Sequence, residues 1–194
     1  ALSVALGAVS WVSGEEKGTV LADGPVRFAP VGLGGRAYFG ADDGYFYCVD
    51  ALDGRLVWKF RAAPSSRKVL GNDRLISVWP IRGGAVLGDG KIHFTAGVWP
   101  FEGGFLYSLD VGKSVDEPDY VATTLPELVP QGYLVQSGNT LLIPGGRAPV
   151  TGYDIEKREF IKYDYRVRQL TNYHVSASGQ WFFHGDRVFD LSLI

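Results

Sequence analysis

Histidine and cysteine are the residue types in this chain with the most capacity for metal binding or nucleophilic chemistry, and both are scarce. His93, His174 and His184 lie far apart in the sequence without the short spacing of metal-ligand pairs, so structural roles are favoured for all three. Cys48 is the single cysteine, so no disulfide can form within the chain. We interpret it as a buried apolar filler, because a free cysteine behaves as a small hydrophobic residue.

A calcium loop is the second chemistry to consider, because residues 42–44 have the sequence Asp-Asp-Gly. A calcium-binding loop needs the spacing Asp-x-Asp-x-Asp-Gly followed by a glutamate, and this spacing is absent here. Apolar runs flank the three residues on both sides, which is typical of a β-hairpin turn. The pattern therefore predicts a hairpin at this position.

A basic segment with nearby tryptophans is the strongest candidate for ligand binding. Residues 61–82 hold five cations and one acid, Asp73, and tryptophan-proline pairs occur at 79–80 and 99–100. Basic groups beside exposed aromatic rings suit anionic or sugar-like ligands, although an outer strand with a solvated loop has the same composition. The candidate contacts to a protein or carbohydrate ligand are Arg67, Lys68, Arg74, Trp79, Arg82 and Trp99.

Composition restricts the classes of partner. The chain has 194 residues, of which 46% are hydrophobic and 21% charged, so it is expected to be globular. Its formal net charge of -2 gives no general attraction to nucleic acid or anionic membranes. No apolar run approaches the ~20 residues that a membrane span needs. We therefore expect neither a nucleic-acid partner nor a membrane span.

The elements that must position these residues are short strands joined by glycine turns. The chain contains 26 glycines, which permit positive φ in turns, and 13% aromatic residues, which favour strands. Similar hairpin units open at Gly35, Gly90, Gly138 and Gly179, at intervals of 55, 48 and 41 residues. Four-stranded propeller blades recur at about 40–50 residues. The predicted fold is therefore all-β, a β-propeller of four-stranded antiparallel blades.

The repeat divides one propeller segment, residues 1–194, into five parts. We expect the tail of a preceding blade (1–18), a blade with a long insertion (19–78), two further blades (79–126 and 127–170) and a partial blade (171–194). Propellers have four to eight blades, so the chain is expected to be about half of a seven- or eight-bladed ring. The remaining blades would come from the same or another chain. The lack of methionine, even at position 1, favours a processed chain or an excised segment.

Residues 48–58 carry the pattern that links the repeats to a known family. Asp50, Gly54 and Trp58 match a motif in which Ala, Asp, Thr-Gly and Trp recur over eleven residues, and Cys48 occupies the alanine position. This segment resembles the tryptophan-docking motif of PQQ-like (quinoprotein alcohol dehydrogenase-like) repeats. It is most similar to the repeats of uncharacterised bacterial proteins of that kind. A kelch interpretation, based on the paired glycines, explains the Asp-x-x-Asp-Gly-x-x-x-Trp run less well.

A degraded second copy of the motif is expected at the N-terminus. Ala1, Gly7 and Trp11 occupy the alanine, glycine and tryptophan positions, and Trp11 precedes Trp58 by 47 residues. In such repeats the tryptophan ring covers the adjacent blade, where a large aromatic side chain buries ~150–250 Å². We therefore expect all of these motif residues to be structural.

The resemblance also bears on cofactors. PQQ-dependent dehydrogenases of this fold class use a calcium ion, an aspartate base, a tryptophan floor and an adjacent cysteine pair, whereas this chain has one cysteine and no assignable Glu-Asn-Asp calcium set. Binding of PQQ or calcium is therefore not expected.

The resemblance implies a non-catalytic binding or scaffolding segment within a larger bacterial protein, in the periplasm or cell envelope. The alternative is part of a PQQ-dependent or other propeller oxidoreductase whose catalytic residues lie outside this chain. Repeats of this kind do not by themselves decide between these functions, because fold does not imply function.

Overall fold

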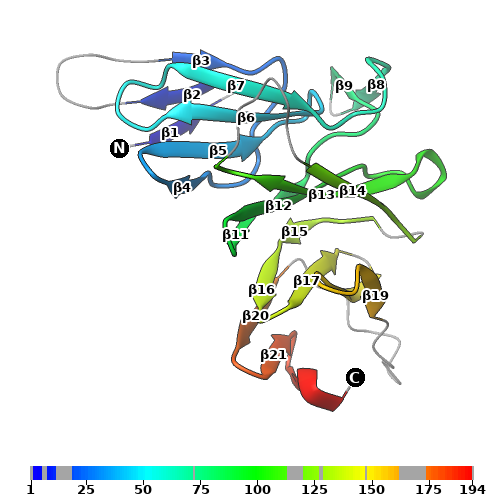
Figure 1. The fold of residues 1–194 in the computed structure, drawn as a ribbon. Coiled ribbons are helices and arrows are strands. Elements are labelled where there is room, and N and C mark those ends of the chain that lie inside the picture. The colour runs from blue at the N-terminus through cyan, green and yellow to red at the C-terminus, as the bar shows by residue number, and fades with distance from the viewer. Residues whose placement is uncertain are drawn as a thin grey trace.

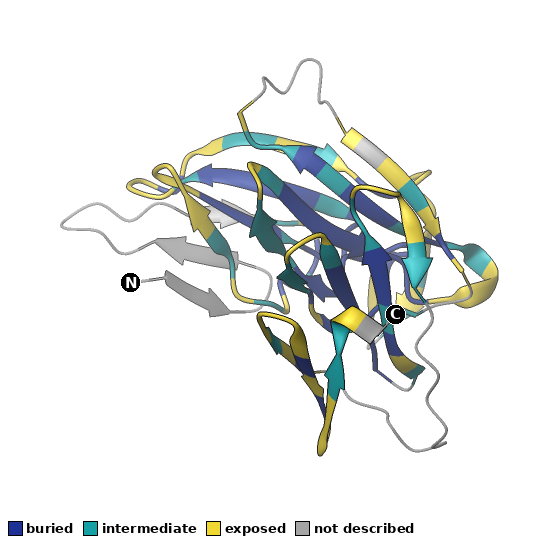
Figure 2. Ribbon diagram, turned by 60° about the horizontal axis from the view of Figure 1, so that its bottom comes forward, coloured by how far each residue is buried: buried dark blue, intermediate teal, exposed yellow. Residues whose placement is uncertain are grey.

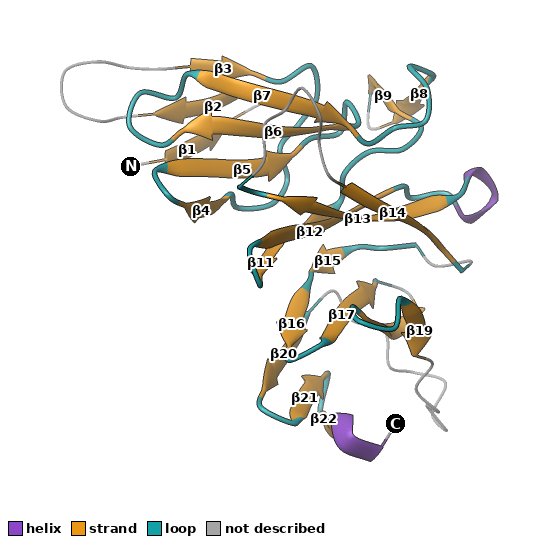
Figure 3. Cartoon of the chain, in the orientation of Figure 1, coloured by secondary structure: helices purple, strands orange, loops and turns teal. Residues whose placement is uncertain are grey.

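The chain folds into a succession of small β-sheets that follow one another from top to bottom of Figure 1. The computed structural model describes residues 2–5, 8–11, 19–71, 73–112, 120–126, 129–146, 148–161 and 174–193. Among these residues the helical elements are two short 3-10 turns, η1 (Pro100–Glu102) and η2 (Leu191–Leu193), both outside the sheets (Figure 3). The predicted all-β class is confirmed.

Three sheets have four antiparallel strands each, paired in the order of the sequence. The first comprises β4 (Val31–Leu33), β5 (Arg36–Gly40), β6 (Tyr45–Asp50) and β7 (Leu56–Arg61). The second comprises β11 (Val86–Gly88), β12 (Lys91–Ala96), β13 (Gly104–Asp110) and β14 (Tyr120–Leu125). The third comprises β16 (Val135–Ser137), β17 (Thr140–Gly145), β18 (Ala148–Asp154) and β19 (Glu159–Ile161). This is the four-stranded meander that the glycine spacing predicts.

Smaller sheets flank these three. An N-terminal sheet comprises β1 (Leu2–Ala5), β2 (Ala8–Trp11) and β3 (Thr19–Leu21), and a C-terminal sheet comprises β20 (Val175–Ser178), β21 (Trp181–His184) and β22 (Arg187–Asp190). A two-stranded hairpin comprises β8 (Lys68–Gly71) and β9 (Arg74–Ser77). Because β3 pairs with β2, residues 19–21 belong to the N-terminal sheet, where the sequence pattern placed a boundary after residue 18.

The same aspartate turn ends the third strand of four sheets. The carboxylates of Asp50, Asp110, Asp154 and Asp190 each accept a hydrogen bond from the backbone N–H two residues further on, at 2.8–3.0 Å. An aspartate side chain in this position closes a local turn in place of a backbone carbonyl. The turn therefore explains why aspartate recurs at the end of each unit.

A short parallel pairing, which the sequence pattern did not predict, joins neighbouring sheets. β10 (Gly83–Gly84) pairs in parallel with β15 (Gly132–Tyr133), ahead of the first strands of the second and third sheets. A Cβ added at Gly83 would lie 2.3 Å from Thr95 Oγ1 in β12, so the close approach of β10 to β12 favours a glycine here.

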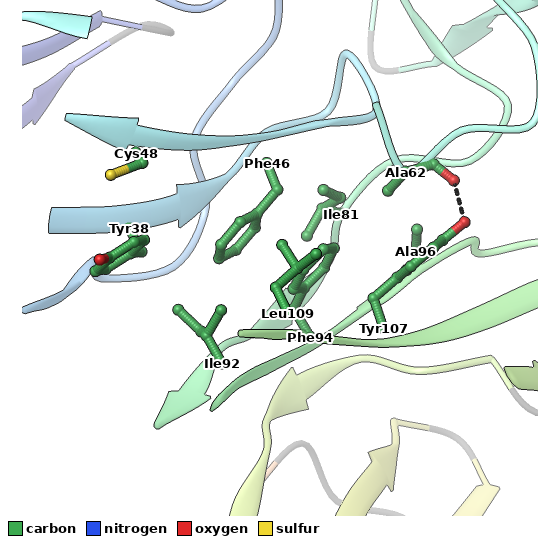
Figure 4. Packing of buried hydrophobic residues seen from close by; sticks show 10 residues of the cluster. All are labelled: Tyr38, Phe46, Cys48, Ala62, Ile81, Ile92, Phe94, Ala96, Tyr107 and Leu109. Carbon is green, nitrogen blue, oxygen red and sulfur yellow. Dashed lines mark hydrogen bonds between the residues drawn. The ribbon is translucent and has the colours of Figure 1, made fainter. Parts of the chain in front are cut away.

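The core lies between successive sheets, where aromatic and aliphatic side chains interlock (Figure 4). Phe46 of the first four-stranded sheet stacks on Phe94 of the second, with ring centroids 3.9 Å apart and an interplanar angle of 2°. The Tyr107 hydroxyl donates a 2.6 Å hydrogen bond to the Ala62 carbonyl across the same interface. Buried residues therefore run through the middle of the stacked sheets, and exposed residues collect at their ends and loops (Figure 2).

Trp58 lies half-buried in β7, against the core cluster that the first two four-stranded sheets share. Its ring is 6.0 Å from that of Tyr38 and 6.5 Å from that of Phe46, both in its own sheet. Its role as a docking residue between blades stays a prediction. In the expected N-terminal copy, Trp11 is in β2, while Ala1 and Gly7 lie outside the described residues.

Replacing Trp58 by alanine should destabilise the fold. We expect Trp58→Ala to lower the free energy of unfolding by about 2–3 kcal/mol, below the ~3–5 kcal/mol of a fully buried ring, because the side chain is only half-buried. Trp99, which is 41% exposed, is the matched control. Trp99→Ala should change the free energy of unfolding by about 0.5 kcal/mol or less. Denaturant unfolding measures both, and equal effects of the two substitutions would refute a structural role for Trp58.

Candidate functional site

Three loops meet at one end of the sheets and hold the residues predicted to bind a ligand. The Ser77 N–H at the end of the β8–β9 hairpin donates a 2.8 Å hydrogen bond to the Asp42 carbonyl in the β5–β6 turn. The Gly97 N–H in the loop after β12 donates a 3.0 Å bond to the Pro80 carbonyl. The hairpin and the η1 loop therefore project from the same end of the molecule, at the right of Figure 1.

Arg67, Trp79 and Glu102 form a connected cluster at this end. The Arg67 guanidinium pairs with the Glu102 carboxylate and lies over the Trp79 ring, with Cζ 5.2 Å from a ring centroid. The Trp79 indole N–H donates a 2.8 Å hydrogen bond to the Glu102 carbonyl. A cation over an indole face and a charge-assisted ion pair together fix the base of the hairpin against the η1 loop.

The structure corrects one expectation about this segment. Trp79 was expected to be an exposed aromatic beside basic groups, but it is only 7% exposed and packs with Ala63 and Val78. Its ring face is covered by Arg67, so it supports the surface and does not offer a platform to a ligand. Trp99 is exposed, and its ring lies 6.1 Å from that of Phe101, which is 82% exposed.

The remaining predicted contacts divide between two places. Lys68 and Arg74 are exposed on the β8–β9 hairpin. Arg82 lies outside the hairpin, and its guanidinium pairs with the Asp42 carboxylate. Phe101 and Glu102 were not predicted as contacts from the sequence, although both directly follow the tryptophan-proline pair at 99–100.

Asp42 is a fully buried carboxylate that binds two arginines. Its Oδ2 accepts a 2.7 Å hydrogen bond from Arg27 Nε, and Arg82 donates to Oδ1 and Oδ2 at 3.1 Å each. The two arginine side chains remain 34% and 21% exposed. The predicted turn at residues 42–44 is confirmed, with Gly44 at φ 85°, and the ion pairs tie this turn to segments 15 and 40 residues away.

Asp43, the second acid of the turn, faces a different set of groups. The Tyr47 hydroxyl donates a 2.5 Å hydrogen bond to its Oδ2, and the backbone N–H groups of Tyr45 and Asp23 also donate to the carboxylate. Burial raises the pKa of Asp43 above its usual range, and it raises the pKa of Tyr47 as well, aided by the hydrogen bond to Asp43. Both carboxylates of the turn are therefore bound, Asp42 by distant arginines and Asp43 by Tyr45, Tyr47 and Asp23.

His93, His184 and Cys48 occupy buried core positions, whereas His174 is exposed. His93 is buried with Nδ1 2.7 Å from Ser108 Oγ, and burial lowers its pKa to about 4, so its ring is neutral near pH 7. Cys48 is buried in the core, and burial raises the pKa of its thiol. Over the residues that the structure describes, no three His, Cys, Asp or Glu side chains gather as a metal ion would need. Whether the chain binds PQQ or calcium stays a prediction.

Comparison with known proteins identifies the fold. No family model and no curated protein matches the chain. The structure is similar to BamB from Moraxella catarrhalis, with a TM-score of 0.62 and 14% identity over 97% of this chain and 57% of that one. It is also similar to the computationally designed proteins Ika4 (TM-score 0.56, 13% identity, 88% of this chain and 93% of that one) and Ika8 (0.54, 12%, 93% and 53%). The β-propeller fold is thereby confirmed.

The similarity to these proteins concerns the fold and not the function. The chain spans little more than half the length of BamB and of Ika8. TM-scores of 0.54–0.62 at 12–14% identity show a shared fold alone, and shared folds host unrelated functions. Within the described ranges, no helix has the length and apolar character to cross a membrane.

Removing the Asp42 carboxylate should loosen the end of the sheets that carries these loops. We expect Asp42→Ala to lower the free energy of unfolding by about 2–3 kcal/mol, less than the ~3–5 kcal/mol for breaking a fully buried pair, because both arginines keep contact with solvent. The control is Asp186→Ala, whose ion pair with Arg187 spans 4.0 Å at an exposed site and should contribute about 0.5 kcal/mol or less. Thermal or denaturant unfolding measures both, and a stability of Asp42→Ala equal to that of the parent would contradict a supporting role for the pair.

Proposed function

We propose that this chain is a non-catalytic binding and scaffolding segment of a β-propeller, and that its loop-bearing end binds a protein. The observation that carries the proposal is the exposed ring pair of Trp99 and Phe101, held on a braced loop. Large aromatic side chains are enriched among the residues that dominate protein–protein binding energy. The resemblance of the repeat supports a larger bacterial protein in the periplasm or cell envelope as its setting.

The bracing of the aromatic pair favours binding over a purely structural role. The Glu102 carbonyl accepts a hydrogen bond from Trp79, and its carboxylate pairs with Arg67, so the last residue of η1 is held by two contacts next to the exposed rings. A rigid exposed anchor loses little conformational entropy when a partner covers it. A protein ligand fits these two rings better than a carbohydrate does, because Trp79, the other predicted aromatic platform, is buried.

An uncovered sheet face supports docking against a further blade. In the C-terminal sheet, Phe182 is buried against the third four-stranded sheet. The alternate residues Trp181 and Phe183 on the opposite face are 44% and 43% exposed, and Val188, directly across from Phe183, is 57% exposed. The corresponding faces of the preceding sheets are covered by the next sheet in the sequence. We propose that a further blade, from the same or another chain, covers this face and continues the ring toward seven or eight blades.

The proposed blade contact predicts self-association of the chain when it is produced alone. Exposed apolar patches of several hundred Å² promote association, so sedimentation velocity should show a concentration-dependent rise in mass. Phe183→Lys with Val188→Glu replaces a directly opposed apolar pair by an opposite-charge pair, and should yield monomers. Leu70→Lys with Leu75→Glu makes the same exchange on the β8–β9 hairpin and should leave the association unchanged. A parent chain that stays monomeric at all concentrations would overturn the blade contact.

Site-specific crosslinking tests the proposed protein-binding end. Phe101 is replaced by a photo-crosslinking residue in the full-length protein, which is produced in its native cells. Irradiation should yield a defined crosslinked protein product. The control position is Leu52, which is 73% exposed in the β6–β7 turn at the other end of the sheets. Trp99→Ala should reduce the Phe101 product by about tenfold, because an anchor residue contributes more than ~1 kcal/mol to binding. Equal products from both positions, or none from Phe101, would refute binding at this end.

A further inference from the structure

The β8–β9 hairpin exposes two leucines that its own folding does not bury. Leu70 and Leu75 are direct cross-strand partners, and they are 72% and 61% exposed. Residues on the other face anchor the hairpin, since Ile76 is 2% exposed and Val69 packs against the cluster around Trp79. Cross-strand apolar pairs with one solvent-facing side form a compact apolar patch. The patch is therefore available to a partner while the opposite face of the hairpin stays attached to the protein.

Two cations that pair with no carboxylate among the described residues flank this leucine pair. Lys68 lies two residues before Leu70, on the same face of the strand, whereas Arg74 directly precedes Leu75 and starts from the opposite face at the tip of the hairpin. Both are exposed, and among the described residues neither is within ion-pair distance of a carboxylate. Arg67, at the base of the same hairpin, differs because Glu102 neutralises it. The exposed apolar patch is thus bordered by positive charge.

The backbone holds this patch in a fixed place. Asp73, directly before β9, takes a left-handed conformation at φ 60°. The Val78 N–H donates to the Arg67 carbonyl at 3.1 Å, and the Ser77 N–H donates to the Asp42 carbonyl at 2.8 Å. A hairpin fixed at its base presents the leucines with little entropy left to lose on binding.

We propose that the β8–β9 hairpin is a docking site for an acidic protein segment that carries bulky aliphatic or aromatic side chains. Those side chains pack on Leu70 and Leu75, and carboxylates of the segment pair with Lys68 and Arg74. This proposal rests on the proposed function as a protein-binding segment and names the chemistry of one partner. An anionic membrane surface fits less well, because polybasic recognition of lipid headgroups uses clusters of four to eight Lys or Arg and this patch holds two.

Binding of short fluorescent peptides to the 194-residue chain tests the docking site. The probe is a peptide in which glutamates alternate with leucines, and the comparison peptides replace the leucines by serine or the glutamates by lysine. Fluorescence anisotropy should show saturable binding of the first peptide only, weakened when salt rises from about 0.05 to about 0.5 M, because salt screens exposed charges. Leu70→Ser with Leu75→Ser, and separately Lys68→Glu with Arg74→Glu, should each weaken binding by about tenfold or more.

Matched variants separate this site from the aromatic pair. Phe101→Ala should leave peptide binding unchanged, as should Leu52→Ser at the other end of the sheets. Circular dichroism and the unfolding midpoint of every variant should equal those of the parent, since all four hairpin side chains are exposed. If Phe101→Ala alone abolished peptide binding, the hairpin site would be overturned and the proposed function would stand. The same conclusion would follow if the chain bound no peptide while Phe101 still crosslinked to a protein. Hairpin-dependent sedimentation with vesicles of anionic phospholipid, without peptide binding, would also overturn it in favour of a membrane surface.

Discussion

Stacking of Phe46 on Phe94 is the contact on which the rest of this structure depends, because it joins the first two four-stranded sheets face to face. A four-stranded sheet has two apolar faces and cannot bury either of them by itself. Each sheet must therefore be covered by the next, which explains why neighbouring positions such as Tyr38 and Phe39 are both buried although they point to opposite faces. The interlocked arrangement of Figure 4 is the local form of this requirement.

Face-to-face packing constrains the strands, and it leaves the loops at the ends of the sheets free to vary in sequence. Loops at the end that carries the β8–β9 hairpin are fixed by a second, polar set of contacts, in which Asp42 binds two arginines and Arg67 joins Trp79 to Glu102. Each of these contacts joins segments that are far apart in the sequence. The result is a rigid base under exposed side chains, an arrangement that suits recognition because binding residues are commonly loop residues positioned by a scaffold.

The similar structures show the architecture of this chain and do not indicate what it binds. A TM-score of 0.62 at 14% identity shows that the sheet arrangement of BamB is reached here with a different set of side chains. The designed proteins Ika4 and Ika8 share the arrangement at comparable identity. The interaction surfaces of this chain must therefore be argued from its own residues, since a fold of this kind specifies the packing of its blades and leaves the composition of its loops open.

The sequence by itself determined the features that arise from contacts between residues close together in the chain. The aspartates at 50, 110, 154 and 190, the glycine-rich hairpins and the turn at residues 42–44 depend on hydrogen bonds that span a few residues, so their local pattern was enough to predict the strands and the repeat. Only the tertiary structure decided which distant side chains meet. Burial of Trp79, pairing of Arg82 with Asp42 and exposure of the Leu70–Leu75 pair depend on how one sheet lies against the next and where the loops return. No local pattern encodes these placements, because residues 40 positions apart come together only after the sheets have packed.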